Sequence, residues 1–426
     1  MSASSAAVEP AMRGAGAATR LIIASSVGNA LEFYEILVYG YFAVTISKVF
    51  FPAANEAVSI LVTLGTFGIS FLARPVGAIF LGAYGDRKGR KQALTLSILL
   101  MTIGTGLMTV MPSYASAGLL APILVIAARL LQGFSVGGEF ASSTAFLVEH
   151  RPDRAGFFAS WQWSSQGFAA LVATGLGVLL TTSMSADTLQ AWGWRIPFAV
   201  GLLIGPVGYY IRHQLDETPE FIEAGEARTP LRDLFVGQWD RLLLTIGAVA
   251  ASTSSQYLLV YMPTYAIREL NLPQSIGFTA AVLAAALQTV AVPFVGIWVD
   301  KVGQTRVMIG AAILFMVTAY PAFVLLGVAP SLGVLIAMVC WISLLKSFFS
   351  GALPSLMAKT FPVATRVSGM SLSYNISVPI FGGFAPFFAQ SLIDLTGSKL
   401  APSYYMIATA ALSLVALLVM RWKYRL

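Results

Sequence analysis

The apolar residues of this chain are grouped in long runs, which short polar segments separate. The runs cover residues 20–48, 57–83, 92–112, 118–148, 156–182 and 193–213, and then 241–266, 275–298, 307–328, 332–360, 367–393 and 402–421. A helix needs roughly 20 apolar residues to cross a bilayer, and the runs reach about that length. The pattern therefore predicts an all-α membrane protein with twelve transmembrane helices.

The polar segments divide these runs into two sets of six. We expect a cytoplasmic tail over 1–19, a six-helix half over 20–213, a cytoplasmic linker over 214–240, a second half over 241–421 and a tail over 422–426. The segment GAYGDRKG at Gly82–Gly89 recurs as GIWVDKVG at Gly296–Gly303, half a chain length later. Two pseudo-symmetric six-helix repeats are typical of transporters, which bind substrate between the halves.

Composition and charge agree with a membrane protein. Hydrophobic residues make up 57% of the chain and charged residues only 11%, whereas soluble domains have about 25% charged residues. The net charge of +7 comes from Lys and Arg in alternate loops, which predicts that both termini are cytoplasmic. Without a soluble domain to carry a basic patch, nucleic acid is not an expected partner, and the lipid bilayer is. The single cysteine, Cys340, rules out a disulfide framework.

The stretch RLLQGFSVGGE, from Arg129 to Glu139, places charges inside an apolar run. A charge at membrane depth costs at least a few kcal/mol, so it normally faces the protein interior and has a partner or a substrate. Gly133 and Gly137 follow Arg129 at steps of four, which lets another helix approach the same face. We therefore expect Arg129 to be a functional residue on the inner face of the bundle.

Several motifs together resemble one transporter family. GAYGDRKGRK and RLLQGFSVGG are similar to motifs of the major facilitator superfamily, and GNALEFYEILVYG, GWRIPF and FGGFAPF to those of its metabolite:proton symporters. TISKVFFPA, WQWSSQG, LDETPEFI and LTGSKLAPSYYM resemble the citrate and tricarballylate carriers. The resemblance implies the major facilitator fold and uptake of citrate or a related tricarboxylate by alternating access, with protons as coupling ion and no cofactor.

Other functions stay open at this point. The same branch contains carriers of dicarboxylates such as α-ketoglutarate, of shikimate and of betaine or proline. A non-transporting membrane sensor or scaffold is the alternative from a different class. The sequence has no P-loop, no His/Cys metal cluster and no Ser/His/Asp set, so we expect neither an enzyme nor a metal site. We expect the protein to be a monomer.

Three cations at membrane depth are candidates for binding a carboxylate. They are Arg74 in the second span, Arg129 in the fourth and Lys346 in the tenth. Arginine suits this role because its planar guanidinium pairs with both carboxylate oxygens. Three cations would match a trianion. Alternatively, an internal carboxylate or a helix-end carbonyl could hold each cation.

Glu32, Glu35 and Glu139 are candidates for the proton-coupling role. Glu32 and Glu35 share one face of the first span, where the resemblance places this function, although the branch often has Asp at the position of Glu35. Burial favours the protonated form of such a carboxyl group, and a nearby arginine favours the charged form. A permanent Glu–Arg ion pair is the structural alternative. His150 and His213 lie at span ends and are expected at the surface.

Neutral polar residues and a loop motif complete the candidates. The neutral substrate-binding candidates are Asn29, Tyr34, Gln132, Gln162, Gln166, Gln256, Tyr257 and Asn375. Each could instead join two helices, in a hydrogen bond worth about 1 kcal/mol or less. By resemblance, a cytoplasmic latch that favours the outward-facing state comprises Gly82, Asp86, Arg87, Gly89, Arg90 and Asp300.

Overall fold

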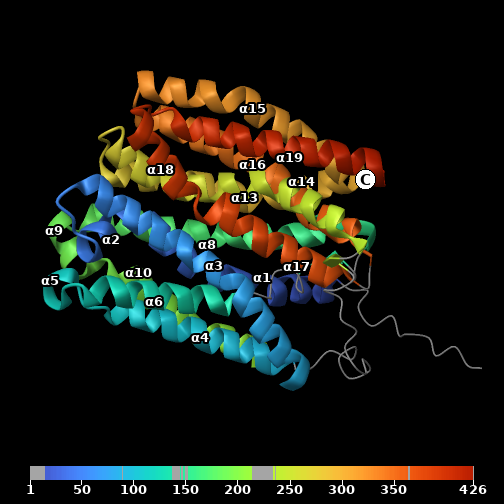
Figure 1. Cartoon of the computed structure of the whole chain (residues 1–426), viewed down its shortest axis with the longest axis horizontal. Coiled ribbons are helices and arrows are strands. Elements are labelled where there is room, and N and C mark those ends of the chain that lie inside the picture. The colour runs from blue at the N-terminus through green and yellow to red at the C-terminus, as the bar shows by residue number, and fades with distance from the viewer. Residues whose placement is uncertain are drawn as a thin grey trace, which may run out of the picture.

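The computed structural model describes residues 15–88, 90–136, 144, 147–148, 152–213, 234–235, 237–362 and 365–425. Within these ranges every regular element is a helix, and the long helices run side by side along the longest axis of the molecule (Figure 1). Helices are the expected solution, because a backbone inside a bilayer must satisfy its own hydrogen bonds. The prediction of an all-α membrane protein is confirmed.

The first group of helices packs mainly within itself. Helix α3 lies against α6, α10 against α4, and α1 against α8 and α10. The long members are α1 (Ala15–Tyr41), α2 (Ala43–Phe50), α3 (Glu56–Lys88), α4 (Arg90–Val110), α6 (Leu120–Ser135), α8 (Ala155–Ser183) and α10 (Arg195–His213). Shorter helical elements in this group are α5 (Tyr114–Ala117), η1 (Pro152–Arg154), α9 (Ala186–Thr188) and η2 (Leu189–Gly193).

The second group follows the predicted linker, most of which (214–233) lies outside the described residues. Its members are α13 (Trp239–Arg268), α14 (Gln274–Val302), α15 (Gln304–Val328), α16 (Leu332–Thr360), α17 (Arg366–Ser377), η4 (Val378–Gly383), α18 (Ala385–Thr396) and α19 (Ala401–Tyr424). Within it, α14 packs on α16, and α19 on both α13 and α15.

Two of the predicted spans are broken. The first is bent by 67° between α1 and α2, at Phe42. The eleventh is interrupted by the π-helical turn η4, which contains the Gly-Gly pair of the FGGF segment. A Cβ atom on Gly383 would lie 2.4 Å from the ring of Phe71 on α3, and one on Gly382 would lie 2.8 Å from the ring of Tyr257 on α13. The glycines therefore let the broken helix reach the centre of the bundle.

Glycines also set the crossing of α3 and α6. A Cβ atom on Gly133 would lie 1.7 Å from the carbonyl oxygen of Ser70, and one on Gly77 would lie 1.8 Å from that of Phe134. Such distances leave no room for a side chain, so the two backbones touch. The predicted close approach at Gly133 is present, and Gly137 lies outside the described residues.

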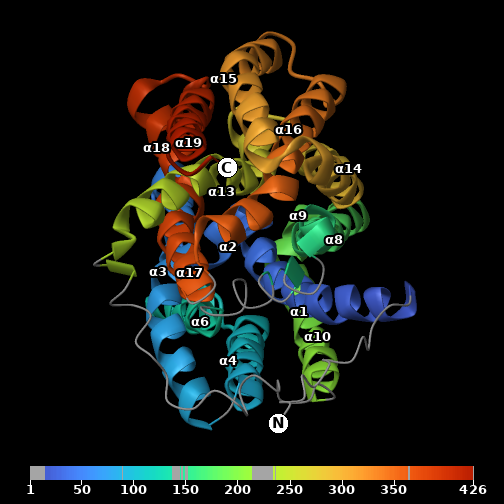
Figure 2. The same cartoon turned by 90° about the vertical axis from the view of Figure 1, so that its right-hand side faces the viewer.

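Helices α8 and α14 join the two groups along their whole length, and Figure 2 shows them side by side. Gly156 faces Gly296 near one end of this contact, Gly167 faces Thr289 in the middle, and Gly177 faces Phe278 near the other end. Helix α3 makes a second contact between the groups, with η4 and α18. The two groups are therefore packed together at both ends of the molecule.

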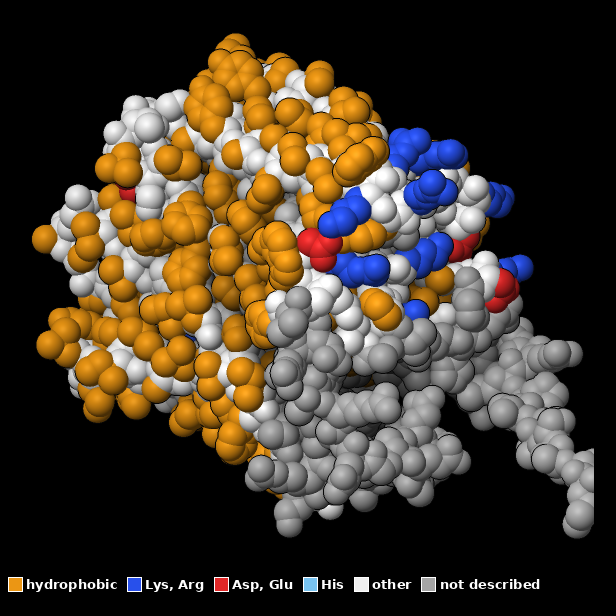
Figure 3. Space-filling model, turned by 45° about the vertical axis from the view of Figure 1, so that its right-hand side comes forward, with side chains coloured by type: hydrophobic (Ala, Val, Ile, Leu, Met, Phe, Trp, Pro, Cys, Tyr) orange, Lys and Arg blue, Asp and Glu red, His pale blue; other side chains and the backbone are white. Residues whose placement is uncertain are grey.

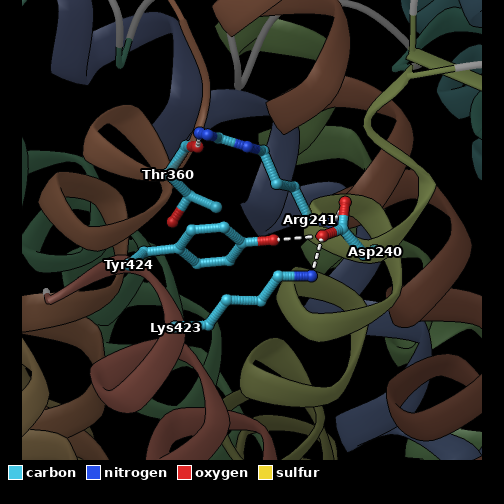
Figure 4. A network of polar contacts seen from close by, with 5 residues as sticks. All are labelled: Asp240, Arg241, Thr360, Lys423 and Tyr424. Carbon is cyan, nitrogen blue, oxygen red and sulfur yellow. Dashed lines mark hydrogen bonds and ion pairs between the residues drawn. The ribbon is translucent and has the colours of Figure 1, made fainter.

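The surface separates into an apolar belt and a basic end, as Figure 3 shows. Leu395, Val328 and Phe294 are 83%, 79% and 67% exposed, which suits side chains that face lipid. At the basic end, Figure 4 shows a polar network that joins the start of α13 to the ends of α16 and α19. There Asp240 accepts hydrogen bonds from Lys423 and Tyr424, each at 2.5 Å, and Arg241 donates to the carbonyl of Thr360.

Candidate functional site

Arg129 lies in the interior of the first group, on α6. Its side chain is fully buried, its Nη1 donates to Oε1 of Gln132 at 2.8 Å, and its Nη2 donates to Oγ of Ser70 at 3.2 Å. The guanidinium lies over the ring of Tyr39, 4.5 Å from the centroid. Its Nε has no hydrogen-bond partner within the described part of the chain. The arginine is thus held in place while one donor remains unused.

Glu35 of α1 is connected to Arg129 through two neutral side chains. Oγ1 of Thr105 on α4 donates to the Glu35 carboxylate, and Nε2 of Gln132 donates to Oγ1 of Thr105 at 3.0 Å. Glu35, Thr105 and Gln132 are all at most 4% exposed. The permanent ion-pair alternative requires a direct bond between the Glu35 carboxylate and the Arg129 guanidinium. In the described ranges the hydrogen bonds instead connect them through Thr105 and Gln132.

Arg74 lies one turn beyond Ser70 on α3, at the contact between the two groups. Its guanidinium lies over the ring of Phe71, 4.4 Å from the centroid. That ring in turn meets the ring of Tyr257 from α13 edge-on, at 5.0 Å. Arg74 is 2% exposed, and its Nη2 has no hydrogen-bond partner among the described residues.

Lys346 is the corresponding buried cation of the second group, on α16. It is fully buried, and its Nζ lies 5.4 Å from the ring centroid of Trp163, which comes from α8 of the first group. Trp163 contacts the ring of Tyr374 on α17, with centroids 6.3 Å apart. Nζ has no hydrogen-bond partner in the part of the chain that the structure describes. A cation–π contact is the interaction that Lys346 makes there.

Further buried polar atoms on α8, α13 and α16 have no hydrogen-bond partner within the described ranges. They are both amide atoms of Gln162 and of Gln166, Oε1 of Gln256, Oη of Tyr257 and Oγ of Ser350. A buried polar atom left unpaired costs about 1–3 kcal/mol. Buried polar atoms are normally paired with protein, water or a ligand. Such unpaired donors and acceptors come from both groups of helices, from α8 of the first and from α13 and α16 of the second.

Two other predicted site residues, Asn29 and Tyr34, join helices. Nδ2 of Asn29 donates to the carbonyl of Gln162 at 2.7 Å and to Oγ of Ser165 at 2.8 Å. Oη of Tyr34 donates to the carbonyl of Pro197 at 2.8 Å, which ties α1 to α10. Glu32 is half-buried on α1, and Asn375 is buried on α17, where it donates to Ser371 at 3.2 Å.

The predicted latch is described only in part. Asp300 on α14 accepts hydrogen bonds from the backbone N–H groups of Gly156 and Phe157, at 2.7 and 3.0 Å. The backbone of Gly82, Asp86, Arg87 and Arg90 is helical, but their side chains lie outside the described residues, as does that of His213. Gly89, Glu139 and His150 are outside them entirely.

Thr105, which bonds Glu35, and Ser70, which bonds Arg129, are polar partners of the predicted site that sequence reasoning missed. Both are hydroxyl residues in apolar spans that contain several others, and hydroxyls are common in transmembrane helices. Nothing in the local sequence separates them from their neighbours. Their role follows from the tertiary contacts with Gln132 and Arg129.

Comparisons of sequence place the chain among transporters. The family model described as "Sugar (and other) transporter" matches residues 21–232. The citrate-proton symporter of Klebsiella pneumoniae is 37% identical, over 94% of this chain and 91% of its own length. The citrate-proton symporter of Salmonella typhi is 35% identical, over 93% of this chain and 92% of its own length. The proline/betaine transporter of Salmonella typhimurium is 33% identical, over 94% of this chain and 83% of its own length.

Comparisons of structure give the same fold. The proton:xylose symporter XylE of the major facilitator superfamily, bound to 6-bromo-6-deoxy-D-glucose, superposes with a TM-score of 0.75, over 96% of this chain and 95% of its own. The partially occluded, inward open form of XylE from E. coli gives 0.73, over 96% and 97%. Sequence identity is 16% in both cases, so these structures bear on the fold alone. The predicted twelve-helix fold is confirmed.

Proposed function

Because this chain belongs to the metabolite:proton symporters of the major facilitator superfamily, we propose that its substrate is citrate or a related tricarboxylate such as tricarballylate. The coarser function is that of a proton-coupled, multi-pass membrane transporter, not an enzyme. The choice of substrate matters, because citrate and proline/betaine carriers are both close relatives.

The observation that carries the proposal is the set of three buried cations. Arg74, Arg129 and Lys346 are at most 2% exposed, and each has a nitrogen without a hydrogen-bond partner among the described residues. A tricarboxylate has up to three negative groups to pair with them, and its binding removes the cost of isolated buried charges. A betaine or proline zwitterion has one carboxylate and brings a positive charge of its own. A dicarboxylate would leave one cation unmatched.

Proton coupling follows from the charge of such a substrate. One charge crossing 100 mV is worth about 2.3 kcal/mol, so a bare trianion entering against an inside-negative potential costs roughly 7 kcal/mol. About three protons, carried by the substrate or by the protein, remove this term. We assign the protein-borne proton to Glu35, because it is the buried carboxylate connected to Arg129.

Alternating access requires contacts that can open at either end. We infer that the basic end is cytoplasmic and that both termini lie there, in the inner membrane of a bacterium. Exposed cations at this end are Lys301, Arg306, Lys359, Arg421, Lys423 and Arg425. Asp300 then holds the cytoplasmic side closed through α8, and Gly177 with Phe278 closes the opposite side. We propose that a monomer carries out this cycle.

Uptake of radiolabelled citrate into proteoliposomes, with and without an inward proton gradient, tests the proposal. We expect gradient-driven uptake by the wild type, its loss in Arg129→Ala, and competition by unlabelled tricarballylate. Unlabelled proline, betaine, α-ketoglutarate and shikimate should compete weakly. Uptake of one of these instead of citrate would overturn the substrate and keep the transporter. Citrate binding without any uptake would favour a sensor or scaffold.

A further inference from the structure

The side chain of Thr105 lies between the proposed proton site and the central arginine. Three hydrogen bonds form a continuous path from Arg129 to Gln132, from Gln132 to Thr105 and from Thr105 to Glu35. The path crosses three helices, α6, α4 and α1. All four side chains are at most 4% exposed, so bulk water does not compete for these bonds.

All three bonds point the same way. The guanidinium donates to the amide oxygen of Gln132, the amide nitrogen donates to the hydroxyl oxygen of Thr105, and the hydroxyl donates to the carboxylate of Glu35. Guanidinium groups have only donors, and a charged carboxylate has only acceptors. The direction of the path is therefore fixed by its two charged ends while Glu35 is ionised.

From this path we infer that Thr105 is a positioning residue that transmits the protonation state of Glu35 to Arg129. The inference rests on the proposed proton-coupled function. A hydroxyl has one donor and two acceptor sites, so it bonds a carboxyl group in either protonation state. Protonated Glu35 donates its new O–H to the hydroxyl oxygen. Thr105 then turns its own hydrogen away and still accepts from Gln132.

Protonation of Glu35 removes the negative charge near Arg129 and leaves the hydrogen-bonded path between them intact. The proton comes from water, the carboxylate loses its negative charge, and no covalent bond within the protein is broken. Arg129 then lacks its internal counter-charge, while Gln132 still holds its guanidinium in position. A substrate carboxylate is attracted to an arginine in this state. Substrate binding is thereby linked to proton binding.

The surroundings of Glu35 contain few other charges. In the described part of the chain, the charged and titratable groups beside it are Arg129 on α6 and, on its own helix, Tyr34 and Glu32, which lies one turn earlier on the same face. Helix α4 presents Thr105, and α10 presents Gly201, where a Cβ atom would lie 3.5 Å from the side chain of Glu35. The hydroxyl of Thr105 is thus the group that connects the Glu35 carboxylate to Gln132 by hydrogen bonds.

The test compares two activities of one purified protein in proteoliposomes. Citrate exchange, with citrate on both sides and no gradient, needs substrate binding and the moving carrier but no net proton transfer. Citrate accumulation driven by an inward proton gradient needs the coupling as well. In Thr105→Val, which keeps the shape and removes the hydroxyl, we expect exchange within about twofold of wild type and accumulation reduced about tenfold. Thr105→Ser should retain both activities.

A second readout is the pH profile of accumulation. Losing a donor to the charged carboxylate favours its protonated form, so the alkaline limb in Thr105→Val should move to higher pH. Thr109→Val is the matched control, because its hydroxyl lies one turn later and donates only to the backbone carbonyl of Thr105, at 2.9 Å. This control should show wild-type coupling and an unchanged profile.

Several outcomes would overturn the inference. They are a parallel loss of exchange and accumulation in folded Thr105→Val, unchanged coupling in that variant, or a Thr105→Ser protein as defective as the valine variant. If the valine variant does not fold, Thr105→Ala replaces it. A wild type that exchanges another acid instead of citrate would contradict the proposed substrate alone, and the same variants are then compared with that acid.

Discussion

Asp300 of α14 accepts a hydrogen bond from the backbone N–H of Gly156, at 2.7 Å, and so fastens the second group of helices to the start of α8. Its other carboxylate oxygen accepts from the N–H of Phe157 at 3.0 Å. The first N–H groups of a helix have no partner within the helix, and its N-terminus attracts negative charge. One carboxylate therefore closes this end of the contact between the two groups.

Replacing Asp300 by Asn should open this end of the molecule. Hydrogen bonds to a charged group are worth about 1.5–3 kcal/mol, and a loss of about 1–2 kcal/mol shifts a two-state population about 5- to 30-fold. We expect Asp300→Asn to populate the cytoplasm-open form. Distances between spin labels on the ends of α8 and α14 would measure the shift, in a protein whose single cysteine, Cys340, is replaced by Ser.

The control for this measurement is Asp187→Asn. Asp187 is an exposed carboxylate on α9, and α9 packs against η2 of its own group of helices. It should leave the distances between the labels unchanged. Equal distances in wild type and Asp300→Asn would contradict the assignment of Asp300 as a closing contact.

The contact between Gly156 and Gly296 should tolerate no side chain in the closed form. A Cβ atom on either glycine would lie 2.7 Å from the carbonyl oxygen of the other. Gly296→Ala should therefore hold the two helices apart, expose the cytoplasmic side and lower the maximal rate of uptake about tenfold or more, since overpacking costs about 1–3 kcal/mol. Thiol labelling of a cysteine placed near this contact would report the exposure.

Gly310→Ala serves as the control for the added methyl group. Gly310 lies within α15, where an added Cβ atom would meet nothing within 4 Å. Its uptake rate and labelling should match wild type. If Gly296→Ala also behaves like wild type, the closed contact is not a required step of the cycle.

Much of this architecture follows from the sequence, because membrane depth makes each polar residue informative. The apolar runs predict the long helices, and an arginine or lysine inside a run is expected at a functional site. Arg129 and Lys346 are indeed fully buried. The bend at Phe42 was not predictable, because no proline or glycine pair marks it.

The hydrogen-bond partners of the site residues were predictable only in part. Asn29 and Tyr34 have the same residue types as ligand-binding side chains, yet in the structure they bond backbone carbonyls of neighbouring helices. Thr105 looks like any other hydroxyl in an apolar span until Gln132 and Glu35 are seen on either side of it. Partner choice of this kind depends on which helix faces are in contact, which local sequence does not encode.

The network around Asp240 should stabilise the second group of helices. Asp240 accepts from Lys423 and from Tyr424, and the guanidinium of Arg241 lies over the Tyr424 ring at 4.7 Å. Because Lys423 is a surface residue and solvent screens its pair, we expect Lys423→Ala to change the melting temperature little. Asp240→Asn removes the negative charge that Lys423 and Tyr424 both bond, so it should lower the melting temperature more than Lys423→Ala does. Thermal unfolding of the detergent-solubilised protein would rank these two variants and the wild type.

Lys346 should set the preference for three negative charges over two. Its ammonium is fully buried beside Trp163, and its Nζ has no hydrogen-bond partner in the described ranges. If it pairs with the third carboxylate of citrate, Lys346→Met should raise the KM for citrate at least about tenfold, which is about 1.4 kcal/mol. A dicarboxylate such as succinate, which needs two cations, should then compete better than citrate. Lys346→Arg keeps the charge and should restore part of the preference.

Lys359→Met is the matched control, since Lys359 is an exposed cation near the end of the same helix. Lys359→Met should leave the KM for citrate and the inhibition constant for succinate unchanged. Substrate binding and helix packing make different demands on Lys346. A lysine that only packs against Trp163 would affect citrate and succinate equally when it is replaced, because neither substrate would touch it. A lysine that binds the third carboxylate changes their ratio. Inhibition constants for the two acids in wild type and in Lys346→Met therefore decide between a binding and a packing role.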